Sequence, residues 1–197
     1  MRAKAVCRGN FLSAPFIVIQ RCYILIDGSN FYYKLKDLGY HDLLNLNFRK
    51  FASLLADDHT IIKSRYYVGR IRQTGTKQGE KMLANQQKLF VVLKNHGFSY
   101  SLGYLLESDG VFHEKGVDVQ IAVDMLVATY ENLCDRIILV SSDTDLAPAI
   151  RKVQEKGKVV EYVGFSHQPS VAMLSRCVAS HILSAKDIAS VINPKVC

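Results

Sequence analysis

The stretch "YILIDGSN", residues 23–30, joins an apolar run to a polar end. Residues 23–26 are aromatic, aliphatic or β-branched, which predicts a buried β-strand. Asp27 ends this strand, and Asn30 follows three residues later. Asp, Ser and Asn are frequent helix N-caps, and residues 31–38 have a helical pattern, so a capping role is one interpretation. A functional carboxylate at the end of the strand is the other, and the rest of the chain has to distinguish them.

Strand-like and helix-like patterns alternate along the whole chain around this stretch. Such alternation predicts right-handed crossovers and a mostly parallel sheet that helices cover on both faces. We therefore expect one α/β domain with three α/β/α layers, in which the apolar first and fourth strands are central. The expected strands cover residues 22–27, 61–71, 98–108, 136–143, 158–165 and 181–184, and the expected helices cover residues 31–38, 48–56, 79–97, 118–133, 146–157 and 170–178.

The bulk composition favours a globular protein with a polyanionic partner. The chain has 197 residues, 49% of them hydrophobic, and a net charge of +7. This length and composition suit a single core, and the basic balance favours polyanions such as nucleic acid or an anionic membrane. The cysteines form no CxxC pair and no regular framework, so we expect neither disulfides nor a zinc site, and a reducing, cytoplasmic location. They are Cys7, Cys22, Cys134, Cys177 and Cys197.

The two ends of the chain differ from its middle. Residues 1–10 are basic and the next nine are mildly apolar, which faintly resembles a signal peptide. The apolar part is short and contains Pro15, so we expect residues 1–21 to form a poorly ordered extension. Residues 22–190 then form the domain and residues 191–197 a short tail. No segment has the length of a transmembrane span, and we expect no membrane association.

Three carboxylates map to the same edge of the predicted sheet. Asp27 ends the first strand, Asp143 ends the fourth, and Asp118 opens the helix that follows the third. Sheets of this kind place their sites at the carboxyl ends of the strands, where the strand order reverses. If the first and fourth strands are neighbours, these acids, far apart in sequence, meet at one place.

Electrostatics favour a cation at such a cluster. Two carboxylates about 4 Å apart repel each other by roughly 4 kcal/mol at an effective dielectric constant near 20. A divalent cation removes that cost, and oxygen ligands favour Mg²⁺ or Mn²⁺ over Zn²⁺. Asp145 is either a helix cap or an outer ligand. Asp124 lies about 120° around the helix from Asp118 and joins the site only if Asp118 sits at the cap.

Three segments resemble the motifs of a known family. "IDGSN", "KGVDVQIAVDML" and "VSSDTDLAPAI" are similar, in this order and spacing, to the motifs of the NYN domain in its LabA-like branch, within the PIN-like nuclease superfamily. The resemblance spans residues 22–184. It implies a PIN-like fold, an acidic pocket for Mg²⁺ or Mn²⁺, and RNA cleavage. Its motif positions fall on Asp27, Asn30, Asp118, Asp124, Asp143 and Asp145.

A metal-dependent ribonuclease mechanism follows from these expectations. Asp27, Asp118 and Asp143 hold the cation, which polarises a phosphate and activates a water. Asp145 is a candidate to take the proton of that water, while Asn30 and Ser142 orient a phosphate or a second water. The substrate is expected to be single-stranded RNA, and a homodimer is left open.

A basic run after the second strand supplies cationic contacts. We expect Arg70, Arg72 and Lys77 to bind phosphates, with a solvated charged surface as the alternative. The aromatic residues that either stack on bases or pack in the core are Phe31, Tyr32, Tyr66 and Tyr67.

Three other classes of protein compete with a nuclease. A catalytically silent RNA-binding or regulatory module keeps the same fold and acids, and only a cleavage assay distinguishes it. An aspartyl-phosphate phosphatase expects a second Asp two residues after the first, where this chain has Ser29. An adhesion-type metal site requires D-x-S-x-S, whereas this chain has D-G-S-N-F.

Overall fold

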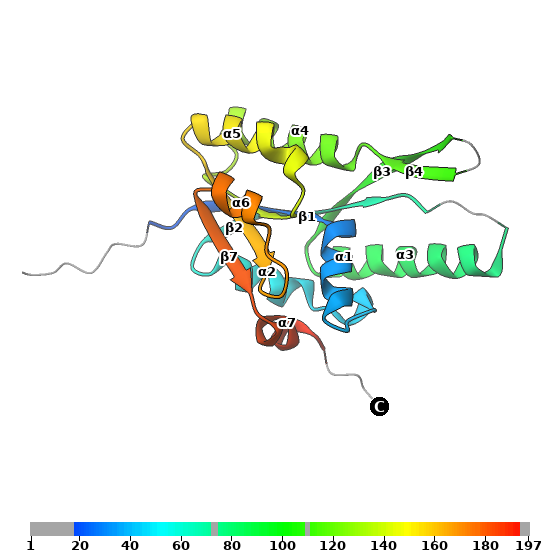
Figure 1. The fold of residues 1–197 in the computed structure, drawn as a ribbon. Helices are drawn as coiled ribbons and strands as arrows, with labels where there is room; N and C mark the ends of the chain where they lie inside the picture. The colour runs from blue at the N-terminus through cyan, green and yellow to red at the C-terminus, as the bar shows by residue number, and fades with distance from the viewer. Residues whose placement is uncertain (1–17, 72–74, 109–110, 194–197) are drawn as a thin grey trace, which may run out of the picture.

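The computed structural model describes residues 18–71, 75–108 and 111–193, which form a sheet between two layers of helices (Figure 1). This is the three-layer α/β/α arrangement that the sequence predicts. The strands are β1 (Arg21–Asp27), β2 (Thr60–Gly69), β3 (Ser99–Ser108), β4 (Val111–Lys115), β5 (Arg136–Val140), β6 (Val159–Phe165) and β7 (Ala179–Leu183). The helices are α1 (Gly28–Asp37), α2 (Phe48–Ala56), α3 (Lys77–Asn95), α4 (Val117–Tyr130), α5 (Ala147–Glu155), α6 (Val171–Arg176) and α7 (Ala185–Val191), with 3-10 turns η1 (Leu43–Asn45) and η2 (Thr144–Leu146).

The sheet has the strand order β4-β3-β2-β1-β5-β6-β7. Its six strands from β3 to β7 are all parallel, and β4 pairs antiparallel with β3. The chain leaves β1 toward β2 on one side and later returns to β5 on the other side. The strand order therefore reverses between β1 and β5, and a crevice at their carboxyl ends is the expected place for a site.

Strand β1 is buried on both faces, as predicted for a central strand. Residues 23–26 are at most 2% exposed. Side chains alternate across the sheet, so Cys22, Ile24 and Ile26 pack with α1, α2, α3 and α7, while Tyr23 and Leu25 pack with α4, α5 and α6. β5 is equally buried, and it pairs directly with β1.

The structure corrects the sequence prediction in a few places. The strand expected at residues 136–143 ends at Val140, because the chain turns into η2. Strand β4 and helix α7 were not predicted. The other expected elements are present, with ends shifted by at most a few residues. Most of the expected N-terminal extension lies outside the described residues. Within the described ranges, no helix is both long enough and apolar enough to cross a bilayer.

Candidate active site

The three predicted carboxylates, Asp27, Asp118 and Asp143, each lie at the start of a helical segment. Asp27 caps α1, where its Oδ1 accepts a hydrogen bond of 3.1 Å from the backbone N–H of Asn30. Asp143 caps η2, where its Oδ1 accepts a hydrogen bond of 2.9 Å from the backbone N–H of Asp145. Asp118 lies in the first turn of α4. The capping interpretation is therefore correct for Asp27. Asp143, rather than Asp145, caps η2, and neither cap excludes a functional role.

These three acids line one pocket of about 320 Å³. The acidic pocket, as we call it, lies at the carboxyl ends of β1 and β5, at the reversal of strand order. The structure thus brings together side chains separated by more than one hundred residues of sequence. The residues that line the acidic pocket are Asp27, Ser29, Asn30, Tyr33, Gly116, Val117, Asp118 and Asp143.

Negative charge accumulates in the acidic pocket. The pKa of Asp118 is raised by partial burial first, then by the charges of Asp143, Asp27 and Asp145 and by a hydrogen bond with Asp143. Among the described residues, Asp118, Asp143 and Asp145 take part in none of the ion pairs. Helix N-termini carry a partial positive charge, which lowers the cost of placing acids at their first turns. The remaining negative charge favours a bound cation.

A buried serine connects two of the acids. Ser141 is 1% exposed, and its hydroxyl donates a hydrogen bond of 2.9 Å to Oδ2 of Asp27. The Ser141 hydroxyl oxygen in turn accepts a hydrogen bond of 3.1 Å from the backbone N–H of Asp143. Sequence reasoning missed Ser141 and selected its neighbour Ser142 instead. The signal available was a serine directly after an apolar strand and two residues before the acid.

Asn30 and Ser142 take different roles. Asn30 lines the acidic pocket, and its Oδ1 accepts a hydrogen bond of 3.2 Å from the backbone N–H of Ser142. The hydroxyl of Ser142 lies 3.3 Å from the hydroxyl of Tyr162. The side chain of Asn30 therefore links the segments that follow β1 and β5, next to the acidic pocket. The side chain of Ser142 instead contacts β6.

Asp124 belongs to a different cluster. Its Oδ2 accepts hydrogen bonds from Arg65 at 2.5 Å and from the hydroxyl of Tyr67 at 2.6 Å, and its Oδ1 accepts one from Gln120 at 3.2 Å. Burial raises the pKa of the Tyr67 hydroxyl, which keeps it a donor. Asp124 is not among the residues that line the acidic pocket. The structure thus places it in a partly buried ion pair between α4 and β2.

Two of the predicted basic residues, Arg70 and Lys77, follow the carboxyl end of β2 and lie near the same edge of the sheet. Arg70 directly follows β2 and is exposed, and Lys77 is exposed at the start of α3. Arg72 lies outside the described residues. The chain around Arg70 is held by Gln86, whose amide donates to the carbonyl of Gly69 at 2.7 Å and accepts from the N–H of Ile71 at 3.1 Å. Hydrogen bonds therefore hold the backbone on both sides of Arg70, while Arg70 itself is exposed to solvent.

The donors of the acidic pocket fit a hard divalent cation. They are carboxylate, amide and hydroxyl oxygens, the ligands that Mg²⁺ and Mn²⁺ prefer. Within the described part of the chain, no three His, Cys, Asp or Glu side chains form a ready-made metal cage. Mg²⁺ commonly keeps several waters and uses one or two carboxylates together with substrate phosphates. The residues present suit a cation bound in that way.

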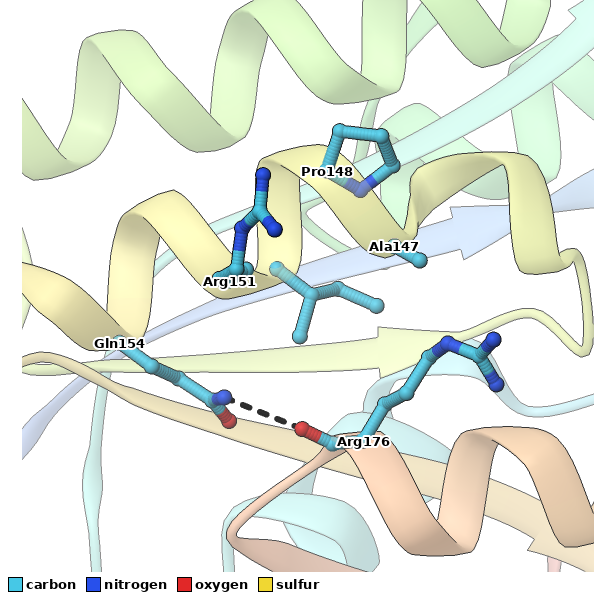
Figure 2. Close-up of a pocket in the computed structure, with 6 residues that line it drawn as sticks. Ala147, Pro148, Arg151, Gln154 and Arg176 are labelled. Carbon is cyan, nitrogen blue, oxygen red and sulfur yellow. Dashed lines mark hydrogen bonds between the residues drawn. The ribbon is translucent and has the colours of Figure 1, made fainter.

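A separate pocket of about 440 Å³ lies between α5 and α6 (Figure 2). Arg151 and Arg176 line it from the two helices, and the amide of Gln154 donates to the carbonyl of Arg176 at 3.0 Å. No carboxylate lines this pocket. It lacks the donors for a cation, so the acidic pocket remains the candidate active site.

Two known proteins resemble this chain in sequence or in structure. An uncharacterized protein of Methanocaldococcus jannaschii is 26% identical over 163 residues, which cover 83% of this chain and 54% of that protein. The chain thus spans about half the length of this relative. A crystal structure of a protein of unknown function from Vibrio parahaemolyticus has a TM-score of 0.65 at 21% identity, covering 84% of this chain and 93% of that one. This second likeness supports the fold alone.

Family membership rests on a match to a protein domain family. The NYN domain matches residues 21–185, which include all the strands and most of the helices described above. All the residues of the acidic pocket fall inside this match. The chain therefore belongs to the NYN domain family.

Proposed function

We propose that the protein is a metal-dependent ribonuclease that hydrolyses phosphodiester bonds of single-stranded RNA in the acidic pocket. The observation that carries this proposal is the convergence of Asp27, Asp118 and Asp143 on one pocket at the switch point of the sheet. The raised pKa of Asp118, caused first by partial burial and then by the neighbouring carboxylates, supports it. The family belongs to the PIN-like nucleases, and the motifs resemble its LabA-like branch. The unpaired thiols of Cys22, Cys134 and Cys177 support a cytoplasmic location.

Asp27, Asp118 and Asp143 would hold Mg²⁺ or Mn²⁺, which when bound polarises a phosphate oxygen and lowers the pKa of water. Ser141 keeps the Asp27 carboxylate oriented through its hydrogen bond. Asp145 is exposed beside Asp143 and would accept the proton of the attacking water. The first turn of α4 has no side-chain cap, so its N–H groups can donate to a phosphate oxygen at the pocket.

Arg70, Arg72 and Lys77 would contact phosphates of the RNA outside the pocket. The exposure of Arg70 and Lys77 near the carboxyl edge supports this role. Such contacts release counterions, so binding should weaken as salt is raised. Ser142 would act through its backbone and through Tyr162 rather than through a free hydroxyl.

The direct test is incubation of the purified protein with end-labelled single-stranded RNA in Mn²⁺, Mg²⁺ or EDTA. The proposal predicts cleavage with Mn²⁺ or Mg²⁺ and none with EDTA. RNA binding without cleavage in any metal would contradict the nuclease and support the silent RNA-binding module. Absence of both would contradict RNA as the ligand.

A further inference from the structure

A second pocket of about 400 Å³ adjoins the acidic pocket and shares Ser29 and Tyr33 with it. We call it the tyrosine pocket. It lies between α1, η1, the end of β2 and α3, and its wall includes Tyr32, Tyr33, Leu44, Val68, Met82 and Leu89. In Figure 1, α1 and α3 lie on the same side of the sheet. A ligand can therefore extend from the acids into this pocket without crossing the sheet.

The wall of the tyrosine pocket is mainly apolar and aromatic. Tyr33 is 61% exposed and Met82 is 49% exposed, and both line this one pocket. Exposed apolar side chains that gather in a groove are typical of ligand-binding sites. The ring of Tyr33 packs edge-on against Tyr32, with ring centroids 5.7 Å apart and an interplanar angle of 61°. This contact restricts the ring and lowers the entropy cost of ordering it against a ligand. The volume falls within the range of about 300–1,000 Å³ that is typical of small-molecule sites.

Several polar groups around the tyrosine pocket are already used within the protein. Both ends of the Gln86 amide are bonded to backbone of the segment after β2. The carboxylate of Asp42 accepts hydrogen bonds from the N–H of Leu44 at 2.9 Å and from Asn45 at 3.1 Å. A flat, mainly apolar ligand group with polar edges suits such a wall. A charged ligand group does not, because burying it there would leave its charge without a partner.

We propose that the tyrosine pocket takes one nucleobase of a single-stranded RNA whose phosphate lies in the acidic pocket. This inference rests on the proposed function and adds the recognition of the substrate. Bases stack on aromatic side chains without strong sequence preference, because every base has a π-face. A base can enter only if it is unstacked and unpaired, which selects single strands over duplex. Arg70, between two residues that line the tyrosine pocket, is placed for the adjoining phosphate.

The test compares ligands with and without a base. Binding of AMP, CMP, GMP, UMP and ribose 5-phosphate is measured by calorimetry in Mg²⁺. The wild-type protein should bind the nucleotides at least tenfold more tightly than ribose 5-phosphate. Tyr33→Ala should abolish this preference and Tyr33→Phe should keep it. Tyr130→Ala, which removes a similarly exposed tyrosine at the far end of α4, should also keep it.

The outcomes separate the tyrosine pocket from the nuclease activity. Equal binding of nucleotides and ribose 5-phosphate, or a Tyr33→Ala variant with the full preference, overturns the inference. If the inference is overturned but the protein cleaves RNA in a metal-dependent way, the proposed nuclease function stands without a base-binding tyrosine pocket. If the base preference depends on Tyr33 but no metal supports cleavage, the pocket is confirmed and the nuclease activity is refuted.

Discussion

Asp27 and Ser141 are joined across the ends of β1 and β5 by a hydrogen bond of 2.9 Å. Both side chains are buried, at 6% and 1% exposure. Ser141 also accepts the backbone N–H of Asp143, so one hydroxyl relates the positions of two acids. Groups that orient metal-binding side chains affect metal affinity strongly, commonly by about 10–100-fold.

Ser141→Ala should weaken Mn²⁺ binding by about tenfold or more, because the carboxylate of Asp27 loses a donor that fixes its orientation. The free energy of unfolding should fall by about 1–3 kcal/mol, since the buried carboxylate of Asp27 loses one of its hydrogen-bond donors. Calorimetric titration with Mn²⁺ measures the first effect and urea unfolding the second. Ser64→Ala, at another buried serine on β2, is the control and should leave Mn²⁺ affinity unchanged. Equal Mn²⁺ affinity of wild type and Ser141→Ala would contradict the orienting role.

Asp124→Asn should destabilise the protein without changing its affinity for Mn²⁺. The side chains of Arg65 and Asp124 are 24% and 13% exposed, and Tyr67 donates to the same oxygen. Breaking a buried pair costs about 3–5 kcal/mol, and the partial exposure here reduces that to about 2–3 kcal/mol. Urea unfolding and Mn²⁺ titration measure the two quantities. A tenfold loss of Mn²⁺ affinity in a folded variant would instead place Asp124 at the metal.

Gly28→Ala should disturb the start of α1. An added Cβ would lie 2.5 Å from the carbonyl oxygen of Tyr67 and would also overlap the ring of Tyr66. Overpacking of this kind costs about 1–3 kcal/mol, and the backbone shift would move Asp27, the preceding residue. Urea unfolding checks the stability and RNA cleavage checks the site. A variant with wild-type stability and activity would show that α1 can move at no cost.

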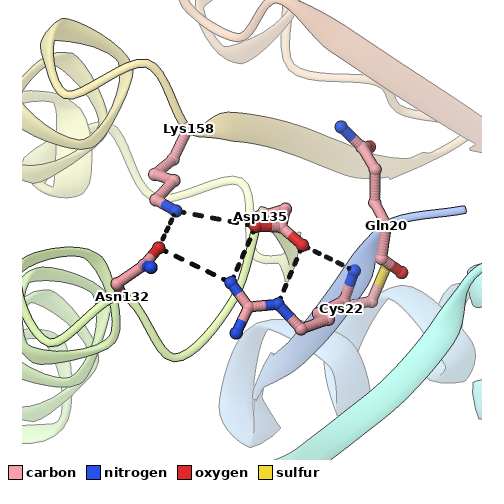
Figure 3. Close-up of polar contacts among 6 residues, drawn as sticks. Gln20, Cys22, Asn132, Asp135 and Lys158 are labelled. Atoms are coloured by element: carbon pink, nitrogen blue, oxygen red, sulfur yellow. Dashed lines mark hydrogen bonds and ion pairs between the residues drawn. The ribbon is translucent and has the colours of Figure 1, made fainter. Parts of the chain in front are cut away.

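The stability contribution of Asp135 should depend on pH. Hydrogen bonds from Arg21 hold the pKa of Asp135 below its usual range. Arg21 starts β1 and Asp135 directly precedes β5, and Lys158 and Asn132 complete the cluster (Figure 3). A lowered pKa in the folded state means that this contribution is present above the unfolded value of about 3.9 and is lost as pH falls.

Unfolding free energies of wild type and Asp135→Asn, measured from pH 7 to pH 3, test this dependence. The difference between the two proteins should stay constant above about pH 5 and shrink below about pH 4. A difference that grows on acidification would show that the Asp135 carboxylate is not stabilised by Arg21.

The fold could be predicted from local pattern because the central strands are continuous apolar runs and most helices have clear starts and stops. Helix α7 was missed although Ser184 and Asp187 form a capping box at its start, a signal present in the sequence. Strand β4 was missed because "VFHEK" has two charges in five residues and no strand alternation. The strand forms by pairing with β3, and such pairing depends on tertiary context that the propensities of single residues do not predict.

The candidate site was partly predictable, because acids at strand ends and helix starts map to one edge by topology alone. Ser141 and Tyr33 could not be identified in this way. Whether Ser141 or Ser142 faces Asp27 depends on how the chain leaves β5, and that strand ends three residues earlier than expected. Tyr33 gains its position from the packing of α1 against the end of β2, which no spacing rule gives.

The most direct test of the central claim is the single-turnover rate of RNA cleavage in Mn²⁺ for wild type, Asp143→Asn and Asp58→Asn. In Asp143→Asn, the amide oxygen can still accept the capping hydrogen bond of η2. The substitution removes the negative charge that would hold the cation. Asp58 is exposed in the turn before β2, away from the carboxyl edge, and serves as the matched control. We predict a loss of cleavage rate of about 10²-fold, or about 2.7 kcal/mol, for Asp143→Asn, with RNA binding retained and the cleavage rate of Asp58→Asn unchanged. A wild-type cleavage rate in Asp143→Asn would contradict it.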